Sequence, residues 1–368
     1  MSFSISHRAA LVAAAILAAA SSAAASSAAA QSYPDRPIRM IVSIAPGSLT
    51  DVIMRAAAQE LTPRLGQPIV IENRGGAAGI PGGQACAQSS GDGHTICVVF
   101  HNQLSFNPVM FNNLPYDVDR DLSLVTRLFF LIESLAVHPS VGVSTVAELK
   151  TLAQGKTRAL NWGTLGQGSA PELFLRWINN QWGTDIVGIP YRGGGPMAQA
   201  LAANEVQVAG VGLGNFLGLN EGGKIKVIAV SASKRSPLVP NVMTFQEAGL
   251  GGYPQRGWWG LAAPKGTPKP VIDRLNSEFV RLFNDPKFVE LLDKQAVVSA
   301  TTSPEEFAAF VKEDRVHAAA LLKLANTPGL NRAIVVLDLL QEIREVVLIH
   351  VLRLEHSAIV AIAVVINL

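Results

Sequence analysis

Three short stretches of this sequence combine glycine with serine, threonine or proline, directly after an apolar run and before a helix-like run. They are APGSLTD (45–51), GTLGQGSA (163–170) and YRGGGPM (191–197). Glycine lets the backbone approach a ligand closely, and the first N–H groups of a helix lack partners and carry a partial positive charge. Such positions bind anions. One stretch alone is more typical of a tight turn, but three together favour a site for a small carboxylated or otherwise anionic solute.

Catalytic motifs are not convincing in this sequence. GTLGQG has the order G-x-x-G-x-G, not the G-x-G-x-x-G of a dinucleotide-binding loop, and no suitable acidic residue follows it. Ser48 and Ser169 do not lie in a G-x-S-x-G elbow. His94, His101 and His138 are isolated, no carboxylate pair stands out, and no Cys or His spacing suits zinc. We therefore expect a binding protein without a cofactor or metal, not an enzyme.

The elements around these stretches predict an α/β fold. Strand-like apolar runs at 38–45, 68–73 and 94–100 alternate with helical patterns, the first at about 51–65. This alternation predicts parallel-rich sheets with helices on their faces, and near-continuous apolar strands are typical of sheets buried on both faces. A second α/β unit begins near residue 132, with a capping box at Thr145 and Glu148. A length of 368 residues also favours two domains.

The chain ends and the overall charge give further expectations. Residues 1–30 resemble a secretory signal peptide cleaved after Ala30; an uncleaved anchor is the alternative, although the apolar core is short of the ~20 residues that span a bilayer. A net charge of +2 without a basic cluster argues against nucleic-acid binding. The tail from 316 to 368 is unusually aliphatic, but its last uncharged stretch, 357–368, is too short for a transmembrane helix.

The chain has two cysteines, Cys86 and Cys97. In an exported protein an even number of cysteines favours a disulfide, and the turn-like SSGDGHTI between them would let a helix and a strand face each other. Two buried free thiols are the alternative, because cysteine is among the most buried residue types.

The stretch YPDRPIRMIVSIAPGSLTDVIMRAAAQELTPRLGQPIVIENRGGAAGIPGG resembles the substrate-binding proteins of tripartite tricarboxylate transporters, often called the Bug family. The resemblance continues in order, to about residue 315, through FNPVMFNNLPYDVDRDL, GTLGQGSAPEL, DIVGIPYRGGGPMAQAL, GKIKVIAVSASKRSPLVPNVMTFQEAG and LAAPKGTPKPVIDRLN. It implies a periplasmic, monomeric, two-domain binding protein of the Venus-flytrap type, whose cleft closes on a small carboxylate and whose partner is a membrane permease. A ligand-binding sensor that signals to a membrane partner is the alternative.

The resemblance also implies boundaries and site residues. Domain 1 comprises residues 31–131 and 262–315, domain 2 comprises 132–261, residues 131–137 and 258–262 form the hinge, and an atypical tail follows from 316. Backbone groups and ordered waters hold the carboxylate in this family, and the matching positions here are Gly47, Ser48, Thr50, His101, Asn102, Thr164, Gly168, Ser169, Gly194 and Gly195. For His101 and Asn102 the alternative is polar groups bonded to the loop backbone.

Three departures from the family pattern concern the expected pocket. Gly47 and Ser48 precede Leu49 where many members have a glycine pair after Ala-Pro. Glu172 stands where a histidine is common, and Val211-Gly212 stands where Asp-Asn is common. Asp51 is expected to cap the helix that follows the first glycine stretch, since its negative charge suits the helix N-terminus. Fewer polar pocket groups remain, which leaves the choice of solute open.

Overall fold

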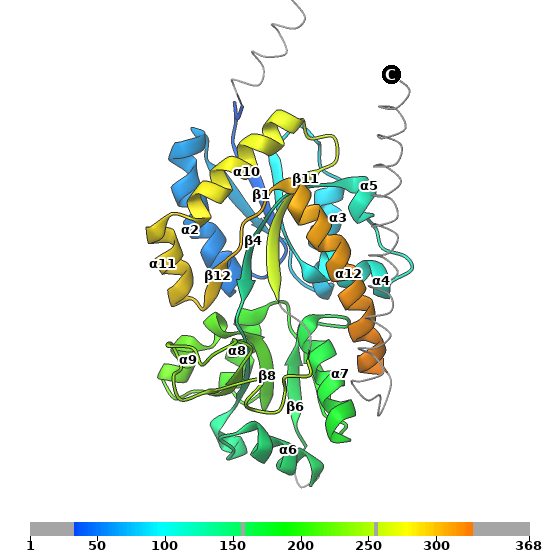
Figure 1. Cartoon of the computed structure of the whole chain (residues 1–368), viewed down its shortest axis with the longest axis vertical. Helices are drawn as coiled ribbons and strands as arrows, with labels where there is room; N and C mark the ends of the chain where they lie inside the picture. The colour runs from blue at the N-terminus through cyan, green and yellow to red at the C-terminus, as the bar shows by residue number, and fades with distance from the viewer. Residues whose placement is uncertain (1–32, 156–158, 254–256, 327–368) are drawn as a thin grey trace, which may run out of the picture.

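Two mixed six-stranded sheets form the cores of two lobes, which lie one above the other in Figure 1. The computed structural model describes residues 33–155, 159–253 and 257–326. The predicted signal peptide and the end of the aliphatic tail lie outside these residues. The expected α/β architecture with two sheets is therefore present.

The first lobe contains the first and last parts of the described chain. Its strands are β1 (Ile38–Val42), β2 (Ile69–Asn73), β3 (Thr95–Phe100), β4 (Leu122–Leu131), β11 (Trp258–Pro264) and β12 (Val297–Ser299), in the order β12-β4-β11-β3-β1-β2. β1 pairs in parallel with β2 and β3, whereas β11 is antiparallel to β3 and β4. Its helices are α2 (Leu49–Leu65), α3 (Ile80–Ala87), α4 (Asn107–Met110), α5 (Val118–Asp121), α10 (Lys269–Phe283), α11 (Pro286–Lys294) and α12 (Pro304–Asn326), with short turns η1 (Ala77–Gly79) and η2 (Asn102–Phe106).

The second lobe contains the central part of the chain. Its strands are β5 (Glu133–Val137), β6 (Asn161–Thr164), β7 (Val187–Pro190), β8 (Val208–Gly212), β9 (Lys226–Val230) and β10 (Met243–Thr244), in the order β10-β9-β5-β8-β6-β7. Its helical segments are η3 (Pro139–Val141), α6 (Val146–Gln154), α7 (Ala170–Trp182), α8 (Gly194–Ala202), η4 (Leu213–Asn215) and α9 (Leu217–Glu221). The capping box of Thr145 and Glu148 at the start of α6 is confirmed.

The connections between the sheets are close to the predicted hinges. The chain passes from β4 to β5 through Ile132. The return lies earlier than the predicted boundary at 262, because β11 belongs wholly to the first sheet and Trp258 already pairs with Phe130 of β4. The chain has therefore already returned to the first lobe at Trp258.

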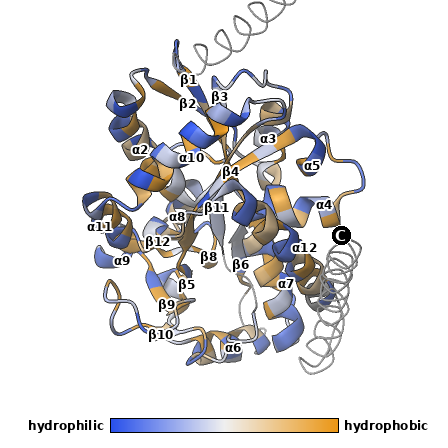
Figure 2. Cartoon of the chain, turned by 45° about the horizontal axis from the view of Figure 1, so that its top comes forward, coloured by the Kyte–Doolittle hydropathy of each residue, from blue (hydrophilic) through white to orange (hydrophobic). Residues whose placement is uncertain are grey.

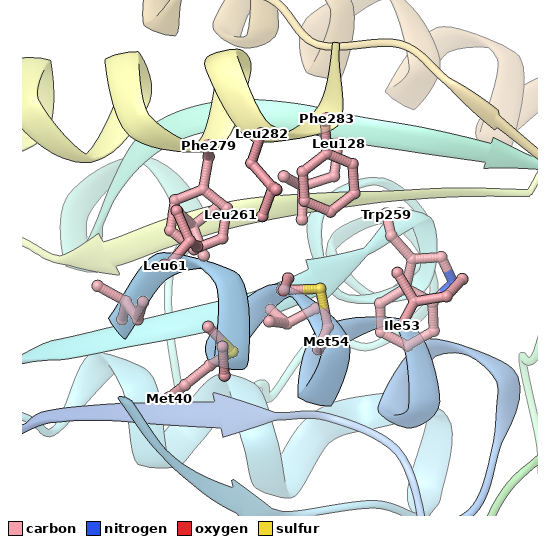
Figure 3. Packing of buried hydrophobic residues seen from close by; sticks show 14 of the residues in the cluster. Met40, Ile53, Met54, Leu61, Leu128, Trp259, Leu261, Phe279, Leu282 and Phe283 are labelled. Carbon is pink, nitrogen blue, oxygen red and sulfur yellow. The ribbon is translucent and has the colours of Figure 1, made fainter. Parts of the chain in front are cut away.

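Neighbouring residues of one strand point to different cores, as the strand period of two requires. Met40 and Val42 pack with α2 and α10, while Ile41 between them packs with α3 and α12. Figure 3 shows α10 directing Phe279, Leu282 and Phe283 toward the sheet, opposite residues of α2. The helices around both sheets carry hydrophobic and hydrophilic residues on different sides (Figure 2), which is why the strands between them are buried on both faces.

Helix α12 connects the two lobes along one side of the molecule (Figure 1). Its residues Ala318 and Leu321 are buried together with Leu173 of α7 and Phe106 of η2. The sequence predicts an atypical tail from residue 316, but residues 316–326 belong to α12, which buries this apolar face. None of the described helices combines the length and hydrophobicity needed to span a bilayer.

A disulfide joins Cys86 of α3 to Cys97 of β3, and both residues are fully buried. It fixes the helix that covers one face of the first sheet to the strand beneath it. The two residues are 11 positions apart in the sequence. A closed loop of this length restricts the unfolded chain, which is one source of disulfide stabilisation.

Removing the disulfide with the double substitution Cys86→Ala and Cys97→Ala should lower the free energy of unfolding by about 2–3 kcal/mol. Urea denaturation with and without a thiol reductant measures this difference. The reductant should destabilise the wild-type protein and leave the double variant unchanged. Equal stability of the two proteins under oxidising conditions would contradict the prediction.

Candidate ligand-binding site

A pocket lies between the two lobes and is lined by residues of both. The first lobe contributes Ile44, Ser48, Leu49, Thr50, Phe100, His101, Asn102, Leu131 and Trp259. The second lobe contributes Glu133, Ser134, Leu165, Ala170, Pro171, Phe174, Gly194, Gly210, Val211, Asn215, Phe245 and Tyr253. Most of this lining is apolar or aromatic, and no lysine or arginine is among these residues.

The ten predicted ligand-binding residues fall into two groups of five. Ser48, Thr50, His101, Asn102 and Gly194 line the pocket. The other five lie in the loops that shape the pocket and are absent from its lining: Gly47, Thr164, Gly168, Ser169 and Gly195. All three predicted glycine stretches therefore meet at the same cleft.

Hydrogen bonds between the lobes surround the pocket. The Ser48 hydroxyl accepts from the Gly195 N–H at 3.3 Å. The Asn215 side-chain oxygen accepts from the Leu49 N–H at 3.1 Å. On another side of the pocket, the Asn102 side-chain amide donates to the Gly168 carbonyl at 2.6 Å. The described structure is thus a closed form, in which the first turn of α2 touches the first turn of α8.

The glycines at 193–195 permit this close approach. A Cβ atom at Gly193 would lie 2.6 Å from the Ser48 hydroxyl of the first lobe, and one at Gly195 would lie 3.0 Å from the Gly47 carbonyl. Contacts below 3.0 Å essentially never occur for real Cβ atoms. Larger residues here would therefore hold the lobes apart.

An internal carboxylate holds the first glycine loop. Asp51 is 1 % exposed and accepts from the Gly47 N–H at 2.9 Å, from Arg55 at 2.9 Å and from the Asn73 amide at 2.8 Å. Burial acts to raise the pKa of Asp51, but the hydrogen bonds outweigh it and lower the pKa below its ordinary value. The predicted helix cap is therefore wrong in its position: Ser48 is the N-cap residue, and Asp51, in the first turn of α2, binds the loop that precedes the helix.

The second lobe repeats this arrangement with the same spacing. Glu172 accepts from the Gly168 N–H at 3.1 Å and forms an ion pair with Arg176. The shared pattern is Gly-Ser, then an acid three residues after the serine and an arginine four residues later. The repeat G-S-x-x-[DE]-x-x-x-R is visible in the sequence. The structure adds that the acid of each repeat accepts from the N–H of the glycine in the same repeat, beside the cleft. It accounts for glutamate at position 172, where the family pattern has histidine.

These carboxylates occupy some of the backbone N–H groups beside the pocket and leave others available. The N–H groups of Gly47 and Gly168 are occupied by Asp51 and Glu172. No described residue accepts from the N–H of Thr50 or Gly194, and both residues line the pocket. The N-termini of α2 and α8 therefore have backbone donors at the pocket without an acceptor among the described residues, and such donors are suited to an anion.

Two aromatic side chains in the pocket lining have unpartnered nitrogens. The His101 Nδ1 lies 3.3 Å from the Trp258 backbone nitrogen and 3.4 Å from the Trp258 carbonyl oxygen, and Nε2 has no partner among the described residues. Burial lowers the pKa of His101 to about 4, so the ring is neutral at pH 7. The Trp259 indole nitrogen, visible in Figure 3, is likewise buried without a partner among them. Neither nitrogen carries a charge.

Sequence reasoning missed Glu133 and Asn215. Glu133 interrupts the apolar run LIESLAV at the point where the chain enters the second lobe, and this interruption is a usable signal. Burial raises the pKa of Glu133 to about 7. Asn215 lies in the short turn after β8, and only its contact with Leu49 of the other lobe shows its role. In the described part of the chain, no cluster of three or more His, Cys, Asp or Glu side chains could hold a metal.

Residues 53–326 match the family described as the tripartite tricarboxylate transporter family receptor, TctC. The chain belongs to this family. A UPF0065 protein of Bordetella bronchiseptica is 32 % identical over 296 residues, which are 80 % of this chain and 88 % of that protein. The receptor is also similar to the periplasmic binding protein BugD, with 29 % identity, a TM-score of 0.76 and coverage of 80 % and 99 %.

A third similarity is to MatC of Rhodopseudomonas palustris with bound malate, with 29 % identity, a TM-score of 0.74 and coverage of 78 % and 99 %. Together these comparisons confirm the two-lobed periplasmic-binding-protein fold. They also confirm that the protein is a solute-binding receptor of a transporter family and not an enzyme. The family match extends to residue 326, where α12 also ends.

Replacing Asp51 with asparagine should destabilise the receptor in a pH-dependent way. A carboxyl group with a lowered pKa in the folded state stabilises the fold above its unfolded pKa, and this contribution is lost as the pH falls through the folded-state pKa. We expect Asp51→Asn to lower the free energy of unfolding by about 2 kcal/mol at neutral pH, because a buried charged acceptor is lost, and by much less at about pH 3. Urea denaturation at both pH values measures this.

Asp273→Asn is the matched control. Asp273 pairs with Lys269 on the surface of α10 and is 51 % exposed, so its replacement should have little effect at either pH. If Asp51→Asn behaved like this control, Asp51 would not be the acceptor that holds the loop.

Proposed function

We propose that this receptor binds a small carboxylate in the cleft and delivers it to the membrane components of a tripartite tricarboxylate-type transporter. The observation that carries the proposal is the meeting of two helix N-termini at one point of the pocket. Thr50 of α2 and Gly194 of α8 each lie within two residues of the Ser48–Gly195 hydrogen bond. Their backbone N–H groups provide a partial positive charge that suits a carboxylate without requiring a basic side chain.

The relatives support a carboxylate ligand and a periplasmic location. The structure of MatC contains bound malate, and BugD is a periplasmic binding protein. For this chain, the location also depends on the predicted signal peptide at residues 1–30. A monomeric receptor that opens and closes between its lobes, and docks on a permease when closed, is consistent with a cleft formed by both lobes.

A thermal-shift screen tests the proposal directly. The purified receptor is heated with mono-, di- and tricarboxylates, aromatic acids and amino acids, with the corresponding amides and alcohols as controls. A ligand at 100 times its dissociation constant stabilises the folded form by about 2.7 kcal/mol, which raises the melting temperature measurably. Stabilisation by an alcohol or amide series, with none by any carboxylate, would overturn the proposal.

Substitutions of Ser48 distinguish a backbone-built site from one built on side chains. Ser48→Ala removes the acceptor for the Gly195 N–H, and the loss of one neutral hydrogen bond should weaken binding about fivefold. Ser48→Leu should abolish binding, because the space beside the Ser48 hydroxyl is too narrow even for a Cβ atom at Gly193. Calorimetric titration with the best carboxylate from the screen measures both.

Small-angle scattering shows whether each Ser48 variant still closes on the ligand. The alanine variant should become more compact with saturating ligand, like the wild type, and the leucine variant should not. Full binding by the leucine variant together with complete loss in the alanine variant would refute a site formed mainly by backbone groups.

A further inference from the structure

Glu133 places a carboxyl group in the pocket wall at the hinge between the lobes. It is the first residue of β5, directly after the crossing at Ile132, and it lines the pocket. Its backbone is fixed in the second sheet, because its N–H donates to the Ser231 hydroxyl and its carbonyl accepts from the Ser231 N–H. The position of the group is therefore set by the sheet.

The carboxyl group itself is confined by its neighbours. A Cβ atom at Gly257 would lie 2.1 Å from the Glu133 Oε1, so the glycine provides the space that the carboxyl occupies. Burial, and after it the charges of Glu133 and Glu172, raise the pKa of Tyr253, and Glu133 and Tyr253 both line the pocket. The Tyr253 hydroxyl donates to the carbonyl of Ala170, another residue of the pocket wall. Glu133 thus lies between the hinge and the start of α7.

No described side chain neutralises this carboxyl. The described residues form no ion pair or hydrogen bond with the Glu133 carboxylate, and the pocket lining contains no lysine or arginine. The other nearby acids are already paired, Asp51 with Arg55 and Glu172 with Arg176. His101 is neutral at pH 7 and burial keeps Tyr253 protonated. A ligand with two carboxylates would bring a second negative charge into a water-poor cleft beside Glu133, which is unfavourable.

Resting on the proposed function, we infer that the solute is a zwitterion, with its carboxylate at the N-termini of α2 and α8 and an ammonium group at Glu133. An ammonium ion supplies the positive charge and the donors that the Glu133 carboxylate lacks among the described residues. The other pocket walls are apolar and aromatic, among them Phe174 and Trp259. They suit an amino acid with an aliphatic or aromatic body.

Glu133 gives this interaction a characteristic pH dependence. Burial raises the pKa of Glu133 to about 7 in the empty cleft, and an ammonium ligand would lower it. A group whose pKa falls on binding favours the complex above its free-state pKa, so affinity should weaken about tenfold between pH 8 and pH 6. A dicarboxylate gives the opposite trend, because it binds better when Glu133 is protonated and can donate a hydrogen bond.

The experiment compares ligand pairs that differ only in the ammonium group. Calorimetric titrations use phenylalanine with 3-phenylpropionate, leucine with 4-methylpentanoate, and glutamate with glutarate. The wild type should bind the amino acid of at least one pair at least tenfold more tightly than its partner. Glu133→Gln should remove this preference while retaining or improving binding of the carboxylate without the ammonium group.

Two control variants make the result specific. Glu290→Gln changes an exposed glutamate on α11 and should keep both the preference and its pH dependence. Arg256 precedes Gly257 in the sequence and lies outside the described residues, so Arg256→Gln is measured in parallel. It should also keep the preference; if it removed the preference as Glu133→Gln does, the charge partner of Glu133 would be that arginine and the inference would fail.

The outcomes separate this inference from the proposed function. Tight binding of dicarboxylates that weakens as the pH rises from 6 to 8, with no preference for ammonium ligands, would overturn the zwitterion and leave a carboxylate receptor. Binding of no carboxylate at all, with or without an ammonium group, would overturn both. A folded Glu133→Gln variant with unchanged selectivity would show that Glu133 does not contact the ligand.

Discussion

The cleft is built around backbone N–H groups at helix N-termini, which have no acceptor within their own helix. No lysine or arginine lines the pocket, so these N–H groups are its main source of positive charge. The contact between Ser48 and Gly195 brings two such helix ends, from α2 and α8, to one point between the lobes. Glycines at 193 and 195 permit this contact, because a Cβ atom at either position would press against Ser48 or Gly47 of the first lobe. The same contact region holds the lobes together, because the Leu49 N–H also donates to the Asn215 side chain there.

Each lobe controls its donors with its own acid. Asp51 and Glu172 occupy the N–H groups of the glycines that precede α2 and α7, and an arginine four residues later balances each acid. The carboxylates thus fix the loops without adding net charge to the pocket. This arrangement differs from a site built on arginine or lysine, because no basic side chain lines the pocket and Glu133 is an acid in its wall.

The lobes are connected by more than the two hinge strands. Helix α12 starts in the first lobe and buries Ala318 and Leu321 against Leu173 of α7 in the second. The same helix holds the Trp258 indole through Asp314, and the Trp258 backbone in turn holds His101 at the pocket. Any opening of the cleft must either preserve this helix contact or slide along it. The packing of α12 therefore limits the direction in which the lobes separate.

The sequence by itself determined the α/β architecture and the three glycine loops, because strand periodicity and turn chemistry are local properties. The family resemblance supplied the two-lobed fold and the ten candidate residues, five of which line the pocket, because its motifs are short and contiguous. The tertiary structure decided which backbone N–H groups of the glycine loops are occupied, because the bonds from Gly47 to Asp51 and from Gly168 to Glu172 depend on how each loop folds back on its helix. It also decided the roles of Asn215 and Glu133, whose neighbours Leu49, Tyr253 and Gly257 are more than 100 residues away in the chain. Contacts between residues so distant in sequence arise only when the lobes fold and close.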